Sequence, residues 1–295
     1  MSLVRIPVVK QPHLKCVVLL LSAVPAALCQ SPAVPPLRRH AEDAQKPKLQ
    51  ALIITGQNTV GHDWRATTPV LRQILEDTGR FEVRVTEAFR GAGPEVLAPY
   101  DVVILNYYDS NQPALRWGKS TEAALLNYVR SGKGIVVWHF SLAAFDGWTE
   151  YEKLCVANWR PNHGHHSPQH DYTVSITERE RDHPIVSGMK ASFLQVHDEL
   201  YANLQWLPDI VTHVLATAWD DHSLYKPGGK QATPGPGLNQ PIMWTTKYGY
   251  GRVFVDALGH DVEAMRSPWF AITLARGAEW AASGEVTIPM PQELR

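Results

Sequence analysis

Histidine side chains that could do chemistry stand at the ends of several apolar segments of this 295-residue sequence. These histidines are His62, His139 and His260. Because neutral imidazoles together with a carboxylate suit Zn²⁺ or a similar divalent ion, one interpretation is a metal site that polarises a carbonyl group or activates water. The alternative is general acid–base catalysis by a histidine and a carboxylate without a metal ion.

Two further segments supply titratable side chains that could join these residues. The loop 158–170 contains four histidines, at a spacing that is not one of the strong metal signatures: His163, His165, His166 and His170. An acidic pair, Asp198 and Glu199, follows later in the chain. Both segments could close over the same crevice as the strand ends.

The sequence therefore predicts a site made of two kinds of residue. The predicted metal ligands are His62, His166 and His260, and the predicted catalytic residues are His139, Asp198 and Glu199. Each histidine also has a structural alternative, a hydrogen bond from its ring to the backbone at the edge of the core. The acidic pair equally fits a solvated turn or an arginine partner. The hypothesis of a site rests on several such residues falling together at strand ends.

Alternating strands and helices in the first half of the chain would position these residues. Buried strands are predicted at 49–54, 81–86, 100–105 and 134–138, and an amphipathic helix at 120–130. Such repeats with short turns imply right-handed crossovers and a parallel sheet covered on both faces. The carboxyl ends of its strands share one edge, where ligands bind in open α/β sheets.

Capping residues set the expected helix starts in this half. Thr67 or Thr68 is expected to cap the first helix, with Pro69 as its first helical residue. Ser141 is expected to cap a helix that follows His139, rather than to act as a nucleophile.

The second half of the chain is less regular. Strands are predicted at 171–177 and 212–219, a hairpin at 241–246 and 252–257, and a closing helix at 268–281. His260 follows the last of these strands, so it reaches the same sheet edge as His139 if that strand is parallel to the others.

Aromatic and amide side chains near the strand ends suit the binding of a sugar. The substrate-binding candidates are Trp64, Asn106, Tyr107 and Trp138. No nucleotide cofactor is expected, because no Gly-x-Gly-x-x-Gly turn follows the first strand and no complete phosphate-binding Gly-x-x-x-x-Gly-Lys-Ser/Thr motif is present. No Gly-x-Ser-x-Gly elbow is present either.

The charge balance gives no electrostatic case for nucleic acid or an acidic membrane as a partner. Lysine and arginine total 28 and aspartate and glutamate total 29, so the formal net charge is −1. A nucleic-acid-binding domain usually carries a basic excess on one face. The expected partner is a small carbohydrate, with a homo-oligomer left open.

The first 30 residues have the pattern of a secretory signal peptide. A basic start precedes the short apolar run Cys16–Val24, and small residues follow, which predicts export to the periplasm or outside the cell rather than a membrane span. Cys29 raises a lipoprotein alternative, but Ala26 stands where a lipid-attachment motif usually has Leu. Residues 31–48, rich in proline and charge, are predicted to be a disordered lead-in.

Several short motifs resemble the trehalose-utilisation (ThuA-like) family. They are 61–64, 134–139, 197–201, 248–254 and 258–261, and the Gly-Arg-Val-Phe…Leu-Gly-His combination of the last two is the most specific. The similarity covers nearly the whole chain after the lead-in. We therefore expect a single ThuA-like domain at residues 49–283 and a C-terminal tail at 284–295.

The resemblance implies a flavodoxin-like, doubly wound α/β fold of the class I glutamine amidotransferase superfamily, with a mostly parallel sheet and helices on both faces. Amidotransferases proper carry a cysteine after the strand that corresponds to 134–138, where this sequence has His139. Cys155, the one cysteine after the predicted signal peptide, is expected to be a buried small hydrophobe. A cysteine-dependent glutaminase is therefore excluded, since it needs a thiolate nucleophile.

The family is associated with carbohydrate metabolism. The resemblance thus implies an enzyme that acts on a disaccharide, a glycoside or a keto-sugar derivative, and the predicted signal peptide would place it outside the cytoplasm. The alternative is a non-catalytic carbohydrate-binding protein that keeps the crevice of an amidotransferase-like ancestor.

Overall fold

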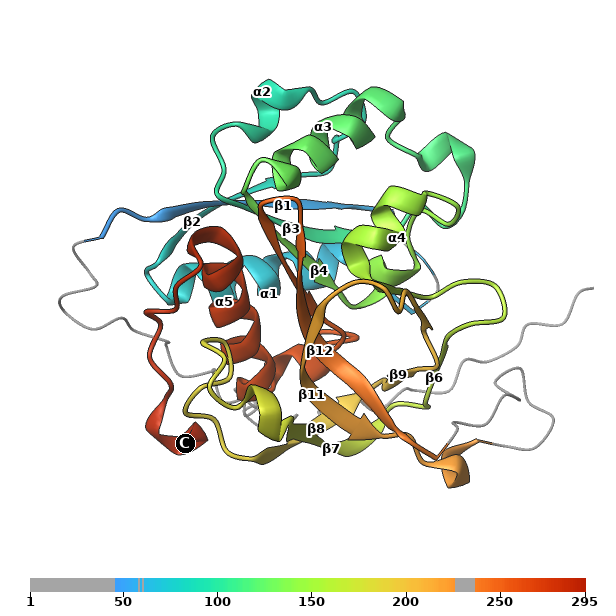
Figure 1. Cartoon of the computed structure of the whole chain (residues 1–295), viewed down its shortest axis with the longest axis vertical. Coiled ribbons are helices and arrows are strands. Elements are labelled where there is room, and N and C mark those ends of the chain that lie inside the picture. Colours follow the sequence, from blue (N-terminus) through green and yellow to red (C-terminus); the bar gives the residue numbers. More distant parts are fainter. Residues whose placement is uncertain (1–45, 58, 60, 226–236) are drawn as a thin grey trace, which may run out of the picture. The chain divides into compact units, whose positions relative to one another are not determined.

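Five strands form the parallel half of a central sheet (Figure 1). They are β1 (Leu49–Gly56), β2 (Phe81–Thr86), β3 (Val102–Tyr107), β4 (Gly134–Trp138) and β13 (Gly251–Asp256), in the spatial order β2-β1-β3-β4-β13. The computed structural model describes residues 46–57, 59, 61–225 and 237–295. The predicted signal peptide and residues 31–45 of the predicted lead-in lie outside these described residues.

Four antiparallel strands continue the sheet from β13. They are β12 (Asn239–Tyr248), β11 (Thr212–Trp219), β7 (His170–Ile176) and β8 (Ser192–Asp198), in that order. The predicted hairpin is thus formed by β12 and β13, and β13 also pairs with β4 in parallel. The α/β class is confirmed, and nine of the strands among the described residues make one mixed sheet.

Helices cover both faces of the parallel half. On one face lie α1 (Trp64–Asp77) and α5 (Pro268–Ser283), and on the other lie α2 (Pro94–Leu97), α3 (Lys119–Arg130) and α4 (Thr149–Cys155) (Figure 1). Short two-residue strands complete the fold: β5 (Ala157–Asn158) with β10 (Gln205–Trp206), and β6 (His165–His166) with β9 (Tyr201–Ala202).

The side chains of β1 show how the two hydrophobic cores arise. Ala51 and Ile53 join the core that includes α1 and α5, whereas Leu52 and Ile54 join the core that includes α3 and α4. Successive residues of a strand point to opposite faces, and here both faces are covered. The inner strands β1, β3 and β4 are therefore continuous apolar runs, whereas the edge strand β2 alternates apolar and charged residues.

The first helix begins one turn earlier than predicted. Asp63 caps α1, since its carboxylate accepts a hydrogen bond from the backbone N–H of Arg65 at 3.0 Å. Thr67, Thr68 and Pro69 therefore lie within the helix. The prediction overlooked that Asp63 is an equally good cap and stands closer to the end of β1.

The C-terminal residues pack onto the domain after α5 ends at Ser283. Ile288, Met290 and Leu294 are buried, and the Glu279 carboxylate accepts hydrogen bonds from the backbone N–H groups of residues 287 and 288. Within the described ranges, no helix has the length and apolar character needed to cross a membrane.

Candidate functional site

Three histidines reach the carboxyl edge of the parallel half from three different strands. His62 follows β1, His139 follows β4, and His260 follows β13, which pairs in parallel with β4 so that Asp256 lies beside Trp138. Glu199 joins them from the end of β8, in the antiparallel half.

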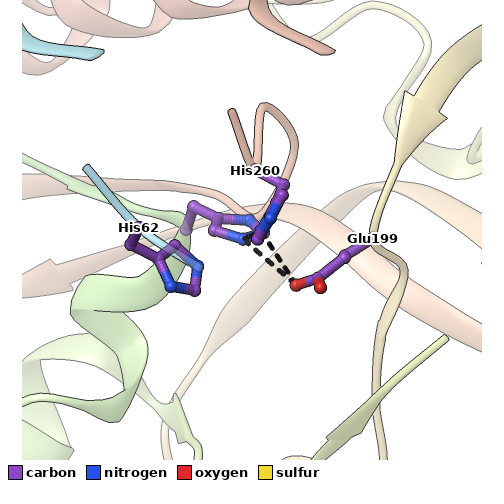
Figure 2. Close-up of side chains that lie close together, drawn as sticks. His62, Glu199 and His260 are labelled. Carbon is purple, nitrogen blue, oxygen red and sulfur yellow. Dashed lines mark hydrogen bonds and ion pairs between the residues drawn. The ribbon is translucent and has the colours of Figure 1, made fainter. Parts of the chain in front are cut away.

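The four side chains converge on one point, as Figure 2 shows for His62, His260 and Glu199. Nδ1 of His260 lies 2.9 Å from Oε2 of Glu199 and 3.4 Å from Nε2 of His139. The His139 Nε2 to Glu199 Oε2 distance is 4.0 Å. His62 completes the group, and one ligand atom from each of the four residues lies within 4.8 Å of the others. We call these four residues the His–Glu centre.

His139 is fully buried and held in a defined orientation. Its Nδ1 lies 2.7 Å from the carbonyl oxygen of Ala257, and since a carbonyl only accepts, Nδ1 carries the proton and Nε2 faces Glu199 unprotonated. Burial, together with neighbouring His62 and His260, holds the pKa of His139 well below its usual range. Its φ of +41° is left-handed, a strained conformation that often marks functional sites.

Glu199 links the His–Glu centre to His166. Burial raises the pKa of Glu199, but hydrogen bonds from His166 and His260 outweigh it and hold the pKa well below the usual range. Nδ1 of His166 lies 3.1 Å from the other carboxylate oxygen, Oε1. The Glu199 side chain is therefore charged at neutral pH. One of its carboxylate oxygens lies beside His166 and the other beside His260.

Asp198 does not line the cavity but hydrogen-bonds to the backbone of residues that do. This carboxylate is fully buried and accepts hydrogen bonds from the backbone N–H groups of Glu199, Gly259 and His260 at 2.7–2.9 Å and from the Gln195 amide. Burial raises the pKa of Asp198 to about 6. The structure thus places this predicted catalytic residue where it positions Glu199 and His260.

A cavity of about 700 Å³ opens over the His–Glu centre, within the size range of small-molecule sites. His62, Glu199, His260 and His166 line it, together with the aromatic rings of Tyr108, Phe140, Trp159 and Tyr201.

The four predicted substrate-binding residues lie outside this cavity. Trp138 is fully buried, with its indole N–H donating to the Leu258 carbonyl, and the Asn106 amide donates to the hydroxyl groups of α1. Trp64 and Tyr107 also pack into the cores. They sit within or beside elements whose side chains point to the sheet faces, so nearness to a strand end along the sequence did not bring them to the edge.

The aromatic residues that do line the cavity come from loops that sequence reasoning did not select. Trp159 belongs to the histidine-rich loop, and Tyr201 follows Glu199 by two residues. The sequence signal that could have identified Trp159 and Tyr201 is their position, within a few residues of the predicted site residues His166 and Glu199.

Only one of the four loop histidines reaches the His–Glu centre among the described contacts. His165 and His166 are neighbours on β6 and point in opposite directions, so His165 pairs with Asp220 at 2.9 Å while His166 meets Glu199. His170 bonds to the carbonyl of Pro168, and His163 forms a backbone bridge with Arg160.

Ser141 does not cap an α-helix. It lies within a 3₁₀ turn, His139–Ala143, where its hydroxyl donates to the Leu105 carbonyl and accepts from the Tyr107 N–H. It therefore ties this turn to the end of β3. Cys155 is fully buried, which raises the pKa of its thiol to about 12, so it offers no thiolate at neutral pH.

These features define an α/β protein with a histidine–glutamate group and a cavity at the carboxyl edge of a mixed sheet. The profile of the ThuA family, described as trehalose utilisation, matches residues 50–281. The chain belongs to the ThuA family.

Solved structures agree with this assignment. A ThuA-like protein from Parabacteroides merdae is 30% identical, with a TM-score of 0.71 over 84% of this chain and 95% of that one. A ThuA-like protein from Bacteroides uniformis is 19% identical, with a TM-score of 0.62 over 83% and 96% of the two chains, and shares the fold. No curated protein matches the chain.

Proposed function

We propose that this protein is an enzyme that acts on a carbohydrate derivative at a divalent metal ion, such as zinc, held by the His–Glu centre. The observation that carries the proposal is the convergence of four ligand atoms within 4.8 Å of one another. The substrate class, a disaccharide, glycoside or keto-sugar, rests on the family description and on the aromatic rings that line the cavity.

The donor set and its spacing fit a metal ion. Ligand atoms at 2.0–2.2 Å from a tetrahedral ion lie about 3.4 Å apart. The described separations among His139, Glu199 and His260 are 2.9, 3.4 and 4.0 Å. The bond from His139 to the Ala257 carbonyl is the kind of outer contact that orients a histidine ligand.

The chemistry follows from the residues around that group. A bound divalent ion would polarise a carbonyl or lower the pKa of water. His166 lines the cavity and donates to Glu199 Oε1, so it can hold or move a proton beside the reacting atoms. Asp198 keeps Glu199 and the His260 backbone in place.

The strand order and the chain start support two finer proposals. The order β2-β1-β3-β4-β13 matches that of flavodoxin-like, doubly wound sheets, which bind ligands at this edge. The basic start and apolar run within residues 1–30 support export, which N-terminal sequencing of the protein recovered from outside the cytoplasm would test.

A non-catalytic carbohydrate-binding protein is the second candidate. It is favoured by the fact that Glu199 already accepts hydrogen bonds from His166 and His260, so these groups are satisfied without a metal ion.

Metal analysis and turnover separate the two candidates. The purified protein is stripped with a chelator, reloaded with zinc, and incubated with trehalose, its keto derivatives and other disaccharides. Stoichiometric zinc and turnover that Glu199→Gln abolishes, but His213→Ala at the surface does not, support the enzyme. Tight sugar binding without turnover, unaltered by His139→Ala, supports the binding protein.

A further inference from the structure

A second group of polar side chains lines the cavity besides the His–Glu centre. It consists of Tyr108, Asn111, Asp146 and Asn162, from three separate loops. We call these four residues the polar wall. The Asn111 amide donates to the Tyr108 hydroxyl at 3.2 Å.

The polar wall carries one negative charge, on Asp146, and the cationic Arg160 beside it also lines the cavity. Asp146 lies 3.5 Å from the buried guanidinium of Arg160, but the same guanidinium pairs with Glu152 at 2.7 Å. The other nitrogens of Arg160 donate to backbone carbonyls and to the Asn158 side chain. One cation therefore serves two carboxylates and has no donor to spare for an anionic ligand.

The backbone of the polar wall is strained yet tied in place. Asn111 and Asn162 of the polar wall have left-handed φ angles of +54° and +66°, and Phe145, the residue before Asp146, has one of +57°. Asp109 accepts a hydrogen bond from the Phe145 N–H at 3.0 Å and lies 3.4 Å from the Asn111 N–H, which joins two of the loops. Strain held by such contacts is typical of positions that present side chains to a ligand.

We propose that the polar wall binds the second ring of a neutral, hydroxyl-rich ligand, and that Asp146 makes the cavity reject anionic sugars. A carboxylate accepts strong hydrogen bonds from hydroxyl groups and repels a phosphate or carboxylate group. A cavity of about 700 Å³ has room for more than one sugar ring. This inference rests on the proposed function only in placing a sugar in this cavity.

Calorimetric titration with trehalose and trehalose 6-phosphate tests the inference. Zinc-loaded wild type is expected to bind trehalose about tenfold more tightly than the phosphate, because the negative wall disfavours the anion. Asp146→Asn is expected to weaken trehalose and reduce this preference to less than about threefold. Glu178→Gln, the same acid-to-amide change at an exposed position, is the control and leaves both affinities unchanged.

A second variant keeps the test decisive if Asp146→Asn does not fold. Asn111→Ala is expected to weaken trehalose by about three- to tenfold and to leave the preference over the phosphate intact. Equal binding of the two sugars by wild type, no trehalose binding, or unchanged affinities in a folded Asp146→Asn or Asn111→Ala variant would overturn the inference. Selective binding without turnover supports this inference and contradicts the proposed enzyme. Turnover without selectivity supports the proposed enzyme and contradicts this inference.

Discussion

At the scale of single residues, hydrogen bonds within and around the His–Glu centre fix the orientation of one side chain and the charge of another. His139 is oriented by the Ala257 carbonyl, and Glu199 is kept charged by its histidine neighbours. His62, His139 and His260 could be selected from the sequence because each follows a strand within a few residues. His166 was also selected, but the sequence did not show which histidine of its loop faces the site, because the alternation of a two-residue strand decides whether His165 or His166 meets Glu199.

Replacing Glu199 by Gln is expected to weaken zinc binding at least about 100-fold, because the change removes the one anionic ligand of the group while keeping its volume. Competition with a chromogenic chelator measures the affinity. Glu263→Gln, at an exposed carboxylate that pairs with His197, serves as the control and retains wild-type affinity. Equal affinities in Glu199→Gln and wild type would contradict the proposed ligand set.

Replacing Asp198 by Asn is expected to lower the free energy of unfolding by about 3 kcal/mol. The carboxylate of Asp198 accepts from buried backbone N–H groups, and the NH₂ group of the new amide could not accept from them. Urea denaturation followed by circular dichroism measures the loss. Asp171→Asn, at an exposed carboxylate that accepts from the His197 N–H, is a milder change of the same kind. Similar losses in the two variants would count against the supporting role of Asp198.

At the scale of elements, the end of β1 and the start of α1 show how a short connection positions one residue of the His–Glu centre. His62 lies between the strand and Asp63, the residue that caps the helix. The sequence predicted both elements but started the helix one turn late, because several capping residues compete within 63–68. Local preference identifies the element better than its first residue.

Replacing Asp63 by Ala is expected to destabilise the domain by about 1 kcal/mol, because the Arg65 N–H loses its acceptor and the helix dipole loses a nearby negative charge. Chemical denaturation measures the change. Asp77→Ala, at the last residue of the same helix, is the control and is expected to be near neutral or slightly stabilising. A loss of equal size at both ends would show that capping is not the cause.

The turn that contains His183 is expected to make stability fall in mild acid. Burial, and then the nearby His213, lower the pKa of His183 to about 4, and its Nδ1 accepts from the Ile185 N–H. The unfolded chain takes up a proton near pH 6.5 while the folded chain does not, so stability is present above pH 6.5 and is lost as pH falls toward 4. After allowance for partial exposure the loss is about 2 kcal/mol.

Denaturation of wild type and His183→Asn between pH 7 and pH 4 measures this loss. The asparagine keeps an acceptor for the Ile185 N–H but does not titrate, so its stability is expected to fall less steeply. Parallel curves for the two proteins would assign the acid sensitivity to other groups.

At the scale of the whole molecule, the parallel half of the sheet was predictable and the order of the antiparallel half was not. Continuous apolar runs such as 49–54 and 134–138 indicate strands buried on both faces. The β12–β13 hairpin could be predicted from the short turn between its strands, but the pairing of β11 with β7 joins segments whose partners no local pattern specifies. Glu199 therefore came to the site through the antiparallel half, which sequence reasoning could place only as a loop that might close over the crevice.

Zinc is expected to stabilise the entire domain, because the His–Glu centre joins residues that follow β1, β4, β8 and β13 and span positions 62–260. A ligand at 100 times its dissociation constant adds about 2.7 kcal/mol, which for a domain of this size raises the melting temperature by about 5–10 °C. Scanning calorimetry of chelated and zinc-loaded protein measures the rise. Glu199→Gln at the same zinc concentration separates binding at the centre from weak binding elsewhere and is expected to show little shift. Identical melting temperatures for chelated and loaded wild type would show that the four residues hold the strand ends together by their own hydrogen bonds, and would favour the metal-free binding protein over the metalloenzyme.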